Sequence, residues 1–304
     1  MTSILITGGS GFIGRHFCQA AHQLGWQITV LSRNPEAATQ LMPDNVQLIS
    51  SLDQIESEQR IDVLLNLAGE PLANGRWTQS RKAFFVSSRI DITKALYQFF
   101  AAREQRPGTV ISGSAVGYYG AGNGGDMEID ESLAGLTGIE DSFSHNLCSQ
   151  WEEVAAQFEQ LGSRVCFLRT GIVLGEGGAL SKMLPAFKLG LGGRMGNGRQ
   201  WMSWIHVEDM VSSIMHCISD ATVSGPVNGT APNPVTNQQF SRTLGTALSR
   251  PAFFPMPAFV IKTLFGEMGE ELLLQGKKVV PRKLQDSGFN FQYPLLPDAL
   301  NSLV

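Results

Sequence analysis

The stretch Ser3-Ile-Leu-Ile-Thr-Gly-Gly-Ser-Gly-Phe-Ile-Gly14 decides the fold of this 304-residue chain. Residues 3–7 form a short apolar run in which β-branched side chains predominate, as is typical of a buried strand. Glycines at positions 8, 11 and 14 follow at once, and an apolar pattern with helical spacing begins at residue 12. The sequence therefore predicts a strand, a glycine-rich turn and a helix in immediate succession.

The three spaced glycines favour a dinucleotide site over a plain turn. Gly8 lets the chain turn tightly off the strand, Gly11 lets the backbone approach a pyrophosphate, and Gly14 lets the helix lie close to the sheet. The free N–H groups at the helix start and the helix dipole favour the negative charge of the ligand. Glycine-rich turns also occur without a ligand, but the position directly between a strand and a helix favours the functional interpretation.

Composition limits the classes of partner. Hydrophobic residues make up 43% of the chain, so a large core is available, and the net charge is −4. No run of lysines or arginines indicates a nucleic-acid groove or an anionic membrane surface. No stretch reaches the roughly 20 apolar residues of a membrane span, and the strand pattern at residue 3 argues against a signal peptide. We expect a cytoplasmic protein that binds neither nucleic acid nor membrane.

The cysteines and histidines do not indicate a metal site. The histidines show neither HxxxH nor HExxH spacing. His206 lies within an apolar run, and we expect it to be a hydrogen-bonded structural residue. The cysteines form no CxxC motif and are expected to be buried free thiols in a reducing compartment: Cys18, Cys148, Cys166 and Cys217.

Strands and helices are expected to alternate over the first 170 residues. This alternation implies right-handed crossovers and an α/β fold with a doubly wound parallel sheet, the Rossmann architecture. A loop is expected over residues 120–140. Strands are predicted at 3–7, 27–32, 46–49, 61–66, 109–112 and 164–169, and helices at 12–24, from 34, at 78–103 and at 144–161.

The pattern changes after residue 171, where glycines become frequent. We interpret 1–170 as a dinucleotide-binding domain and 171–304 as mainly a smaller substrate-side subdomain. Some of its segments should return to the sheet, and a small C-terminal domain should begin at about residue 250. The sequence predicts a strand at 201–207 and helices at 208–218, 238–248 and 259–275.

The end of the second strand indicates which nicotinamide cofactor binds. In dinucleotide folds an acid there accepts hydrogen bonds from the 2′-hydroxyl of NAD, whereas a basic residue accommodates the 2′-phosphate of NADP. This strand ends in Ser32-Arg33 without an acid. Arg33 can pair with a phosphate and Ser32 can add a hydrogen bond, so NADP(H) is favoured over NAD(H). The alternative is a surface arginine beside a helix cap.

Small and hydroxyl-bearing residues end the next two predicted strands. Asn66-Leu-Ala-Gly69 ends the fourth strand and would let a cofactor pass close to it. Ser112 and Ser114 end the fifth strand, where carboxyl ends of central strands face the bound nicotinamide and the substrate.

Four segments together resemble the extended short-chain dehydrogenase/reductase family: TGGSGFIG (7–14), NLAG (66–69), SGSAVGYYG (112–120) and WIHVED (204–209). The chain is most similar to the atypical, sugar-nucleotide-epimerase-like branch, the epimerase family proteins of bacteria. The part from about Arg250 resembles the small domain that ends those proteins. Further segments look like the same branch: Gly69-Glu-Pro71, Arg76-Trp77, Leu147-Cys148, Trp151-Glu152, Leu168-Arg-Thr-Gly171 and Gly198-Arg-Gln200.

The resemblance implies roles for the matching positions. Ser114 would hydrogen-bond the reacting carbonyl or hydroxyl group. The pyrophosphate would lie along Gly8, Ser10, Gly11, Phe12 and Ile13. Ser32 and Arg33 would hold the ribose phosphate, and Leu67, Ala68 and Gly69 would flank the adenosine half. Thr170, Gly171 and Val173 would lie toward the nicotinamide. Arg89 falls near a position that often approaches the cofactor, and Ser112 is also expected to contact it.

The sequence departs from the family in the proton-transfer pair. Active members use a tyrosine and a lysine four residues later, because the ammonium group lowers the tyrosine pKa. No tyrosine of this chain has a lysine four residues later, and Phe143 stands where the motif should open the next helix. Tyr118, Tyr119 or His145 could replace the pair, catalysis could be lost, or the proton carrier could lie elsewhere. Tyr118 and Tyr119 could equally be pocket wall, whereas His145 is better explained as a surface or helix-start histidine.

Two functions remain open from the sequence. One is an NADP(H)-dependent oxidoreductase or epimerase-like enzyme acting on a carbonyl or alcohol, with Arg194 and Arg199 as tentative substrate contacts. These arginines could also be ordinary loop residues. The other is a non-catalytic NADP(H)-binding sensor or partner-docking module. The chain is expected to be a monomer or a homodimer that pairs through the helices at 78–103 and 144–161.

Overall fold

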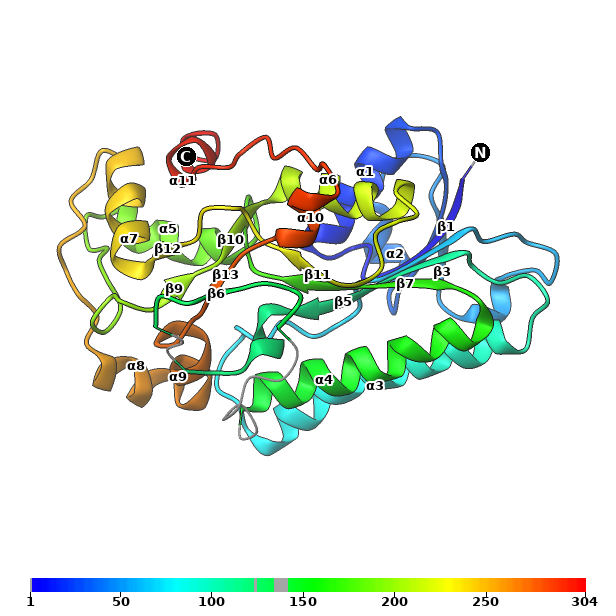
Figure 1. Ribbon diagram of the computed structural model, residues 1–304, viewed down its shortest axis with the longest axis horizontal. Helices are drawn as coiled ribbons and strands as arrows, with labels where there is room; N and C mark the ends of the chain where they lie inside the picture. Colours follow the sequence, from blue (N-terminus) through cyan, green and yellow to red (C-terminus); the bar gives the residue numbers. More distant parts are fainter. Residues whose placement is uncertain (1, 123–124, 134–141) are drawn as a thin grey trace.

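The computed structural model describes residues 2–122, 125–133 and 142–304, so part of the loop expected over 120–140 lies outside the described residues. A seven-stranded parallel sheet runs through the centre in the order β11-β7-β5-β4-β1-β2-β3. The predicted doubly wound Rossmann architecture is confirmed (Figure 1). The strands are β1 Ser3–Thr7, β2 Gln27–Leu31, β3 Gln47–Ile49, β4 Val63–Asn66, β5 Thr109–Ala115, β7 Arg164–Thr170 and β11 Gly225–Gly229.

Helices cover both faces of the sheet. Figure 1 shows α3 and α4 on one face and α1 and α6 on the other. Successive β1 residues alternate between the two cores: Ile4 and Ile6 pack towards α1 and α6, and Leu5 packs towards α3. Both faces of the strands are therefore apolar, as expected for a buried parallel sheet. The helices are α1 Phe12–Gln23, α2 Pro35–Thr39, α3 Gln79–Ala101, α4 Phe143–Ala156 and α6 Val207–Ser219.

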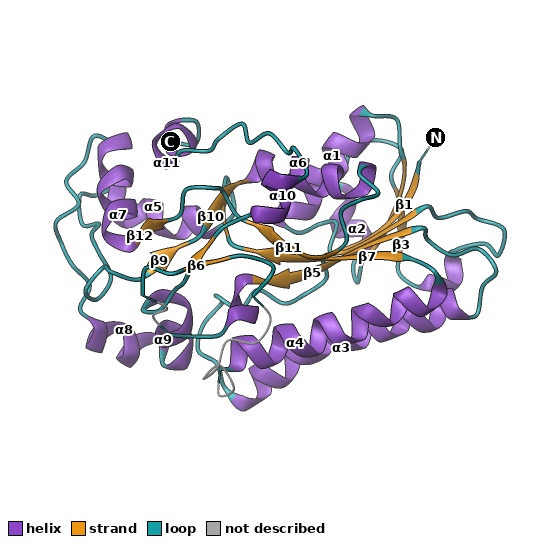
Figure 2. Cartoon of the chain, viewed as in Figure 1, coloured by secondary structure: helices purple, strands orange, loops and turns teal. Residues whose placement is uncertain are grey.

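A second group of elements lies beyond the carboxyl ends of the strands and forms its own core, which includes Trp204, Phe240 and Leu300 (Figure 2). The helices that contribute to this core are α5 Ala179–Lys188, α7 Asn237–Ala247 and α11 Leu296–Asn301. The other C-terminal helices pack elsewhere: α8 Ala258–Phe265 and α9 Glu267–Leu273 lie together, with Met268 against Trp77 and Phe85, and α10 Arg282–Asp286 lies against the central sheet through Leu284. Short strand pairs complete the group: β6 Glu128–Ile129 with β13 Lys278–Val279, β8 Ile172–Leu174 with β10 Trp204–His206, and β9 Trp201–Met202 with β12 Val235–Thr236.

Three predicted elements need correction. The strand expected at 201–207 is two strands, and α6 begins at Val207 because the His206 side chain accepts a hydrogen bond from the Glu208 backbone N–H and so caps the helix. The helix expected at 259–275 is broken into α8 and α9 at Gly266, whose φ of +60° ends the first helix. The fifth strand does not end at residue 112 but continues to Ala115, so that Ser114 lies within it.

No helix in the described part of the chain is long and apolar enough to cross a membrane. All four cysteines are free and buried. The cytoplasmic location stays a prediction.

Candidate cofactor and active site

The glycine-rich turn between β1 and α1 is closely packed at Gly8 and Gly14 and exposed to solvent at Gly11. Gly8 has a φ of +69°, and a Cβ atom there would lie 2.5 Å from the Leu67 carbonyl oxygen. A Cβ atom on Gly14 would lie 2.3 Å from the Gly8 carbonyl oxygen. Gly11, the N-cap residue of α1, is exposed. The open helix start therefore has the shape and the free N–H groups that a pyrophosphate requires.

The end of β2 carries a cation without a partner in the described residues. The Ser32 hydroxyl accepts a hydrogen bond from the Asn34 backbone N–H at 3.2 Å, and Asn34 in turn caps α2. Arg33 is exposed, and its guanidinium forms no ion pair with any described residue. This arrangement leaves the guanidinium at the carboxyl end of the strand available for an anionic ligand.

A buried hydrogen-bond relay fixes the turn after β4. The Thr7 hydroxyl donates to the Asn66 side-chain oxygen at 2.6 Å, and the Asn66 amide donates to the Thr93 hydroxyl at 2.8 Å. The Ala68 backbone N–H donates to the Thr7 hydroxyl at 3.2 Å. These contacts hold Leu67 and Ala68 against the glycine-rich turn. The turn after β1 and the turn after β4, both predicted to contact the cofactor, therefore lie side by side.

Arg89 of α3 supports the turn after β4 through hydrogen bonds to backbone carbonyls. Its guanidinium donates to the Glu70 carbonyl at 2.9 Å and to the Phe85 carbonyl at 3.1 Å, and it lies over the Trp151 ring. A Cβ atom on Gly69 would lie 2.8 Å from the Arg89 guanidinium carbon, so a larger residue there would displace the guanidinium. Burial lowers the pKa of Arg89 to about 10. The structure thus gives Arg89 a supporting role, and its predicted contact with the cofactor stays a prediction.

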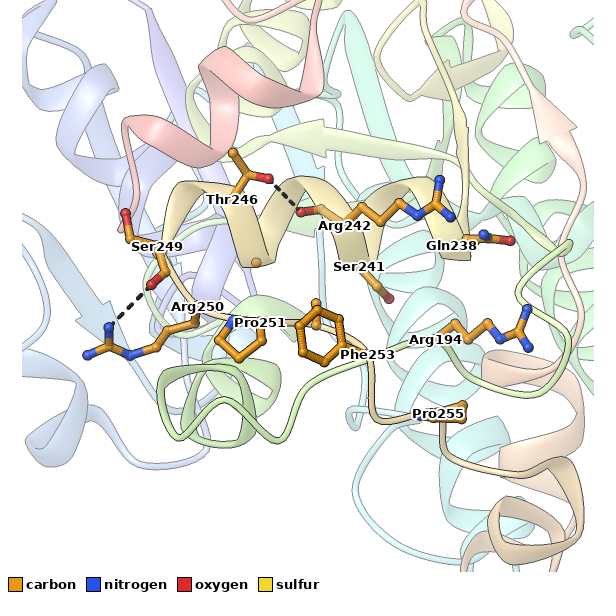
Figure 3. Close-up of a pocket in the computed structure, with 12 residues that line it drawn as sticks. Arg194, Gln238, Ser241, Arg242, Thr246, Ser249, Arg250, Pro251, Phe253 and Pro255 are labelled. Atoms are coloured by element: carbon orange, nitrogen blue, oxygen red, sulfur yellow. Dashed lines mark hydrogen bonds between the residues drawn. The ribbon is translucent and has the colours of Figure 1, made fainter.

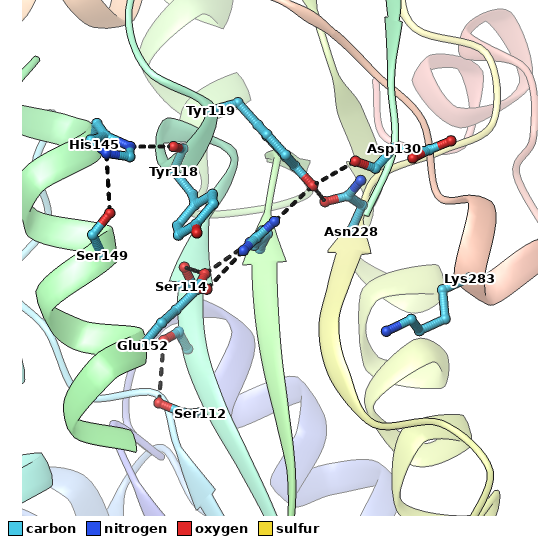
Figure 4. Close-up of polar contacts among 12 residues, drawn as sticks. Ser112, Ser114, Tyr118, Tyr119, Asp130, His145, Ser149, Glu152, Asn228 and Lys283 are labelled. Atoms are coloured by element: carbon cyan, nitrogen blue, oxygen red, sulfur yellow. Dashed lines mark hydrogen bonds and ion pairs between the residues drawn. The ribbon is translucent and has the colours of Figure 1, made fainter. Parts of the chain in front are cut away.

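Three neighbouring strands present a row of polar side chains to α4 (Figure 4). Ser114 on β5 and Asn228 on β11 are both paired in register with Arg169 on β7. The Arg169 guanidinium forms two hydrogen bonds to Glu152 of α4, at 2.9 and 2.8 Å, and the Ser114 hydroxyl donates to Glu152 at 2.6 Å. Burial alone would lower the pKa of Arg169, but its hydrogen bonds to Glu152 and the carboxylate charge outweigh burial and raise it.

The two predicted tyrosines flank Arg169 differently. The Tyr118 ring centroid lies 3.4 Å from the guanidinium carbon, a cation–π contact. The Tyr119 hydroxyl accepts a hydrogen bond from Arg169 at 3.0 Å and donates to Asn228 at 2.8 Å. Tyr119 is 1% exposed, and burial raises its pKa. Tyr119 is therefore a structural member of the network, whereas the half-buried Tyr118 is the more accessible phenol.

The start of α4, where the family places its proton-transfer pair, is covered by the C-terminal part of the chain. Both carboxylate oxygens of Glu271 on α9 accept hydrogen bonds there, from the Phe143 N–H at 3.1 Å, the Ser144 N–H at 3.1 Å and the Ser144 hydroxyl at 2.6 Å. Phe143 packs against the Trp77 ring. A carboxylate at a helix N-terminus is electrostatically favourable, so the two parts of the chain are firmly joined here.

A lysine and a histidine lie at the carboxyl end of β5. His145, in the first turn of α4, contacts the Tyr118 carbonyl through Nδ1 and the Ser149 hydroxyl through Nε2. Lys277 donates to the Tyr119 carbonyl, and burial lowers the pKa of its ammonium group. His145 thus has backbone and hydroxyl partners and lies beside the tyrosines.

The remaining predicted residues divide into two groups. Most lie at the same edge of the sheet, because carboxyl ends of parallel strands meet there. The exceptions are Arg194 and Arg199, which lie in an exposed loop, and Arg194 lines a groove on the outer side of α7. Their substrate role stays a prediction. The residues at the sheet edge are Ser10, Phe12, Ile13, Ser112, Thr170, Gly171 and Val173.

Sequence reasoning did not assign roles to five residues of this site. Glu152 and Arg169 lie within segments that resemble the family, but no spacing rule links residues from a helix and a strand. A weak signal existed, because an arginine within an apolar strand and a glutamate within a helix require a partner when both are buried. The unassigned residues are Glu152, Arg169, Asn228, Glu271 and Lys277.

The comparisons with known proteins agree with this geometry. The model of the NAD dependent epimerase/dehydratase family matches residues 4–228. The chain belongs to this family. A second family model, a domain of unknown function designated DUF1731, matches residues 256–303. The resemblance inferred from the sequence is therefore confirmed.

Family relatives match along nearly the whole chain. Epimerase family protein YfhF of Bacillus subtilis is 38% identical over 99% of this chain and 98% of its own length. The human epimerase family protein SDR39U1, solved with NADPH, matches with a TM-score of 0.87 and 32% identity over 99% of both chains. A UDP-glucuronic acid 4-epimerase from Bacillus cereus, at 17% identity and a TM-score of 0.78, covering 98% of this chain and 96% of its own, shares the fold.

Proposed function

We propose that this family member binds NADP(H) across the carboxyl edge of its sheet. The pyrophosphate would lie on the open helix start at Gly11, and Arg33 would pair with the 2′-phosphate. The observation that carries this proposal is the exposed Arg33 at an acid-free strand end. The NADPH in the structure of the human relative supports it.

We further propose an oxidoreductase or epimerase-like reaction on a carbonyl or alcohol substrate. The bound nicotinamide would supply hydride transfer. The substrate would lie beside Ser114, between residues 1–170 and 171–304. Because the Ser114 hydroxyl donates to Glu152, its oxygen presents lone pairs to a substrate hydroxyl. Ser114 would therefore orient the reacting oxygen rather than remove a proton from it.

Tyr118 is our candidate for the proton carrier. Its ring lies against the Arg169 guanidinium, which would hold the half-buried phenol beside Ser114 at the carboxyl end of β5. Arg169 would thus position the phenol in a chain that lacks the usual lysine. The start of α4 supports the alternative, a non-catalytic NADP(H)-binding protein, because Phe143 and Leu147 stand at the positions of the usual pair and Glu271 covers the helix start.

Replacing Tyr118 by phenylalanine should lower the rate of NADPH oxidation by about 10²-fold, because general acid–base groups contribute roughly this much. Ser114→Ala should give a loss of similar size. The measurement is NADPH absorbance with a panel of aldehydes, ketones and keto sugars. Ser213→Ala, which removes a buried hydroxyl that donates to the Met210 carbonyl on α6, is the matched control. Unchanged rates in both variants, or no turnover by the wild type, would favour the non-catalytic alternative.

A further inference from the structure

A groove lies on the outer side of the subdomain, between α7 and the segment 249–255 (Figure 3). Its volume is about 860 Å³, which is within the usual range for binding sites. Figure 3 shows Arg194, Gln238 and Arg242 gathered at one end, and Arg250 at the other, with Phe253 between them. The groove therefore has two cationic ends and an aromatic middle.

Close backbone packing fixes the walls of this groove. A Cβ atom on Gly245 of α7 would lie 2.7 Å from the Ala252 Cβ atom, so the wall segment lies directly against the helix. A Cβ atom on Gly193 would lie 2.2 Å from the Phe254 carbonyl oxygen, and the Phe254 N–H donates to the Gly192 carbonyl at 3.2 Å. These close backbone contacts fix the shape of the groove.

The groove is positively charged, whereas the whole chain carries a net negative charge. The chain has a net charge of −4, but residues 177–207 and 221–266 contain no aspartate or glutamate. The guanidiniums of Arg194, Arg242 and Arg250 form no ion pair with any residue that the structure describes. Of the seven lysines and arginines in these two segments, Arg194, Arg242 and Arg250 line the groove. An acidic occupant would complement this surface.

Large apolar side chains continue the groove on both sides. Phe253 is 76% exposed, and Phe254 next to it is 57% exposed. Leu189 is 75% exposed and lies in the chain next to Lys188, whose carbonyl accepts a hydrogen bond from Arg250. A surface rich in exposed aromatic, leucine and arginine side chains and lacking carboxylates has the composition of a protein–protein interface.

We propose that this groove binds an acidic protein segment that carries an aromatic or aliphatic anchor. The anchor would pack against Phe253, and acidic side chains on either side of it would pair with Arg242 and Arg250. A second copy of the chain placed groove to groove would bring cationic ends together without carboxylates between them, which is unfavourable. A bilayer would not enter a concave groove, whereas an extended segment fills one. The site is separate from the cofactor edge.

The test begins with selection of a display library of short random peptides on the wild-type protein. The selected peptides should be rich in aspartate and glutamate around an aromatic or leucine residue. Fluorescence anisotropy should then show at least about tenfold weaker binding to Arg242→Glu and to Phe253→Ser. Arg106→Glu, the same charge change at an exposed residue outside the groove, should bind the peptides like the wild type. NADPH affinity should be unchanged in all three variants.

Three results would overturn the proposal. The first is that the selected peptides lack acidic residues, or bind the Arg242 and Phe253 variants as tightly as the wild type. The second is a wild-type dimer in analytical ultracentrifugation that Phe253→Ser converts to a monomer, which would make the surface a self-interface. The third is binding to vesicles rich in phosphatidylglycerol that Phe253→Ser abolishes, which would make it a membrane contact.

Discussion

Replacing Arg169 by methionine should destabilise the protein by about 3–5 kcal/mol, the usual cost of removing one partner of a buried ion pair. Glu152 is 7% exposed and Arg169 is 4% exposed, so the variant leaves a carboxylate buried with the Ser114 hydroxyl as its one remaining side-chain donor in the described residues. The measurement is urea unfolding monitored by circular dichroism. We expect a lower midpoint and an unchanged dependence of the unfolding free energy on urea concentration.

Two further variants separate charge from packing. Adding Glu152→Gln to Arg169→Met removes the unpaired charge and should restore a large part of the lost stability. Arg60→Met, which removes the exposed partner of Asp62, should cost less than about 1 kcal/mol, as is usual for a surface ion pair. A loss below about 1 kcal/mol in Arg169→Met would contradict the structural importance of the pair.

Replacing Gly14 by alanine should destabilise the protein by about 1–3 kcal/mol and weaken NADPH binding by more than about tenfold. The new Cβ atom would lie 2.3 Å from the Gly8 carbonyl oxygen and 2.7 Å from the Gly9 Cα atom. These are backbone atoms of the cofactor turn, so α1 must move away from the turn. Thermal unfolding and calorimetric titration measure the two effects.

Gly108→Ala is the matched control for this substitution. A Cβ atom on Gly108 would have the Asp62 carbonyl oxygen as its nearest contact, at 3.9 Å, so the residue can be replaced without a clash. We expect a change in stability of less than about 1 kcal/mol and unchanged NADPH binding. If Gly14→Ala behaved like this control, the close packing of the turn would be disproved.

The fold was predictable because its signals are local. The run Ser3 to Thr7, the spaced glycines and the repeated alternation of strand and helix each depend on neighbouring residues. The right-handed crossovers restrict the possible sheet orders, but the edge strand β11 was not predicted. Gly266 shows the limit of this reasoning: the apolar pattern continues across it, and only its left-handed backbone conformation divides α8 from α9.

The candidate site was predictable only in part. The glycine turn and the end of β2 are continuous in the sequence, so their roles could be inferred from them. The pairing of Glu152 with Arg169 and the contact of Glu271 with α4 connect residues distant in the sequence, and they depend on tertiary packing. The extension of β5 to Ala115 likewise follows from pairing with β7, which no local propensity specifies.

The measurement that tests the central claim most directly is calorimetric titration of the protein with NADPH and with NADH, in the wild type and in Arg33→Asp. We expect NADPH to bind far more tightly to the wild type. The substitution should weaken NADPH binding by about 2 kcal/mol or more, roughly thirtyfold, because it replaces an attractive phosphate contact by a repulsive one. Equal affinity of the wild type for both cofactors, or binding of neither, would contradict the account.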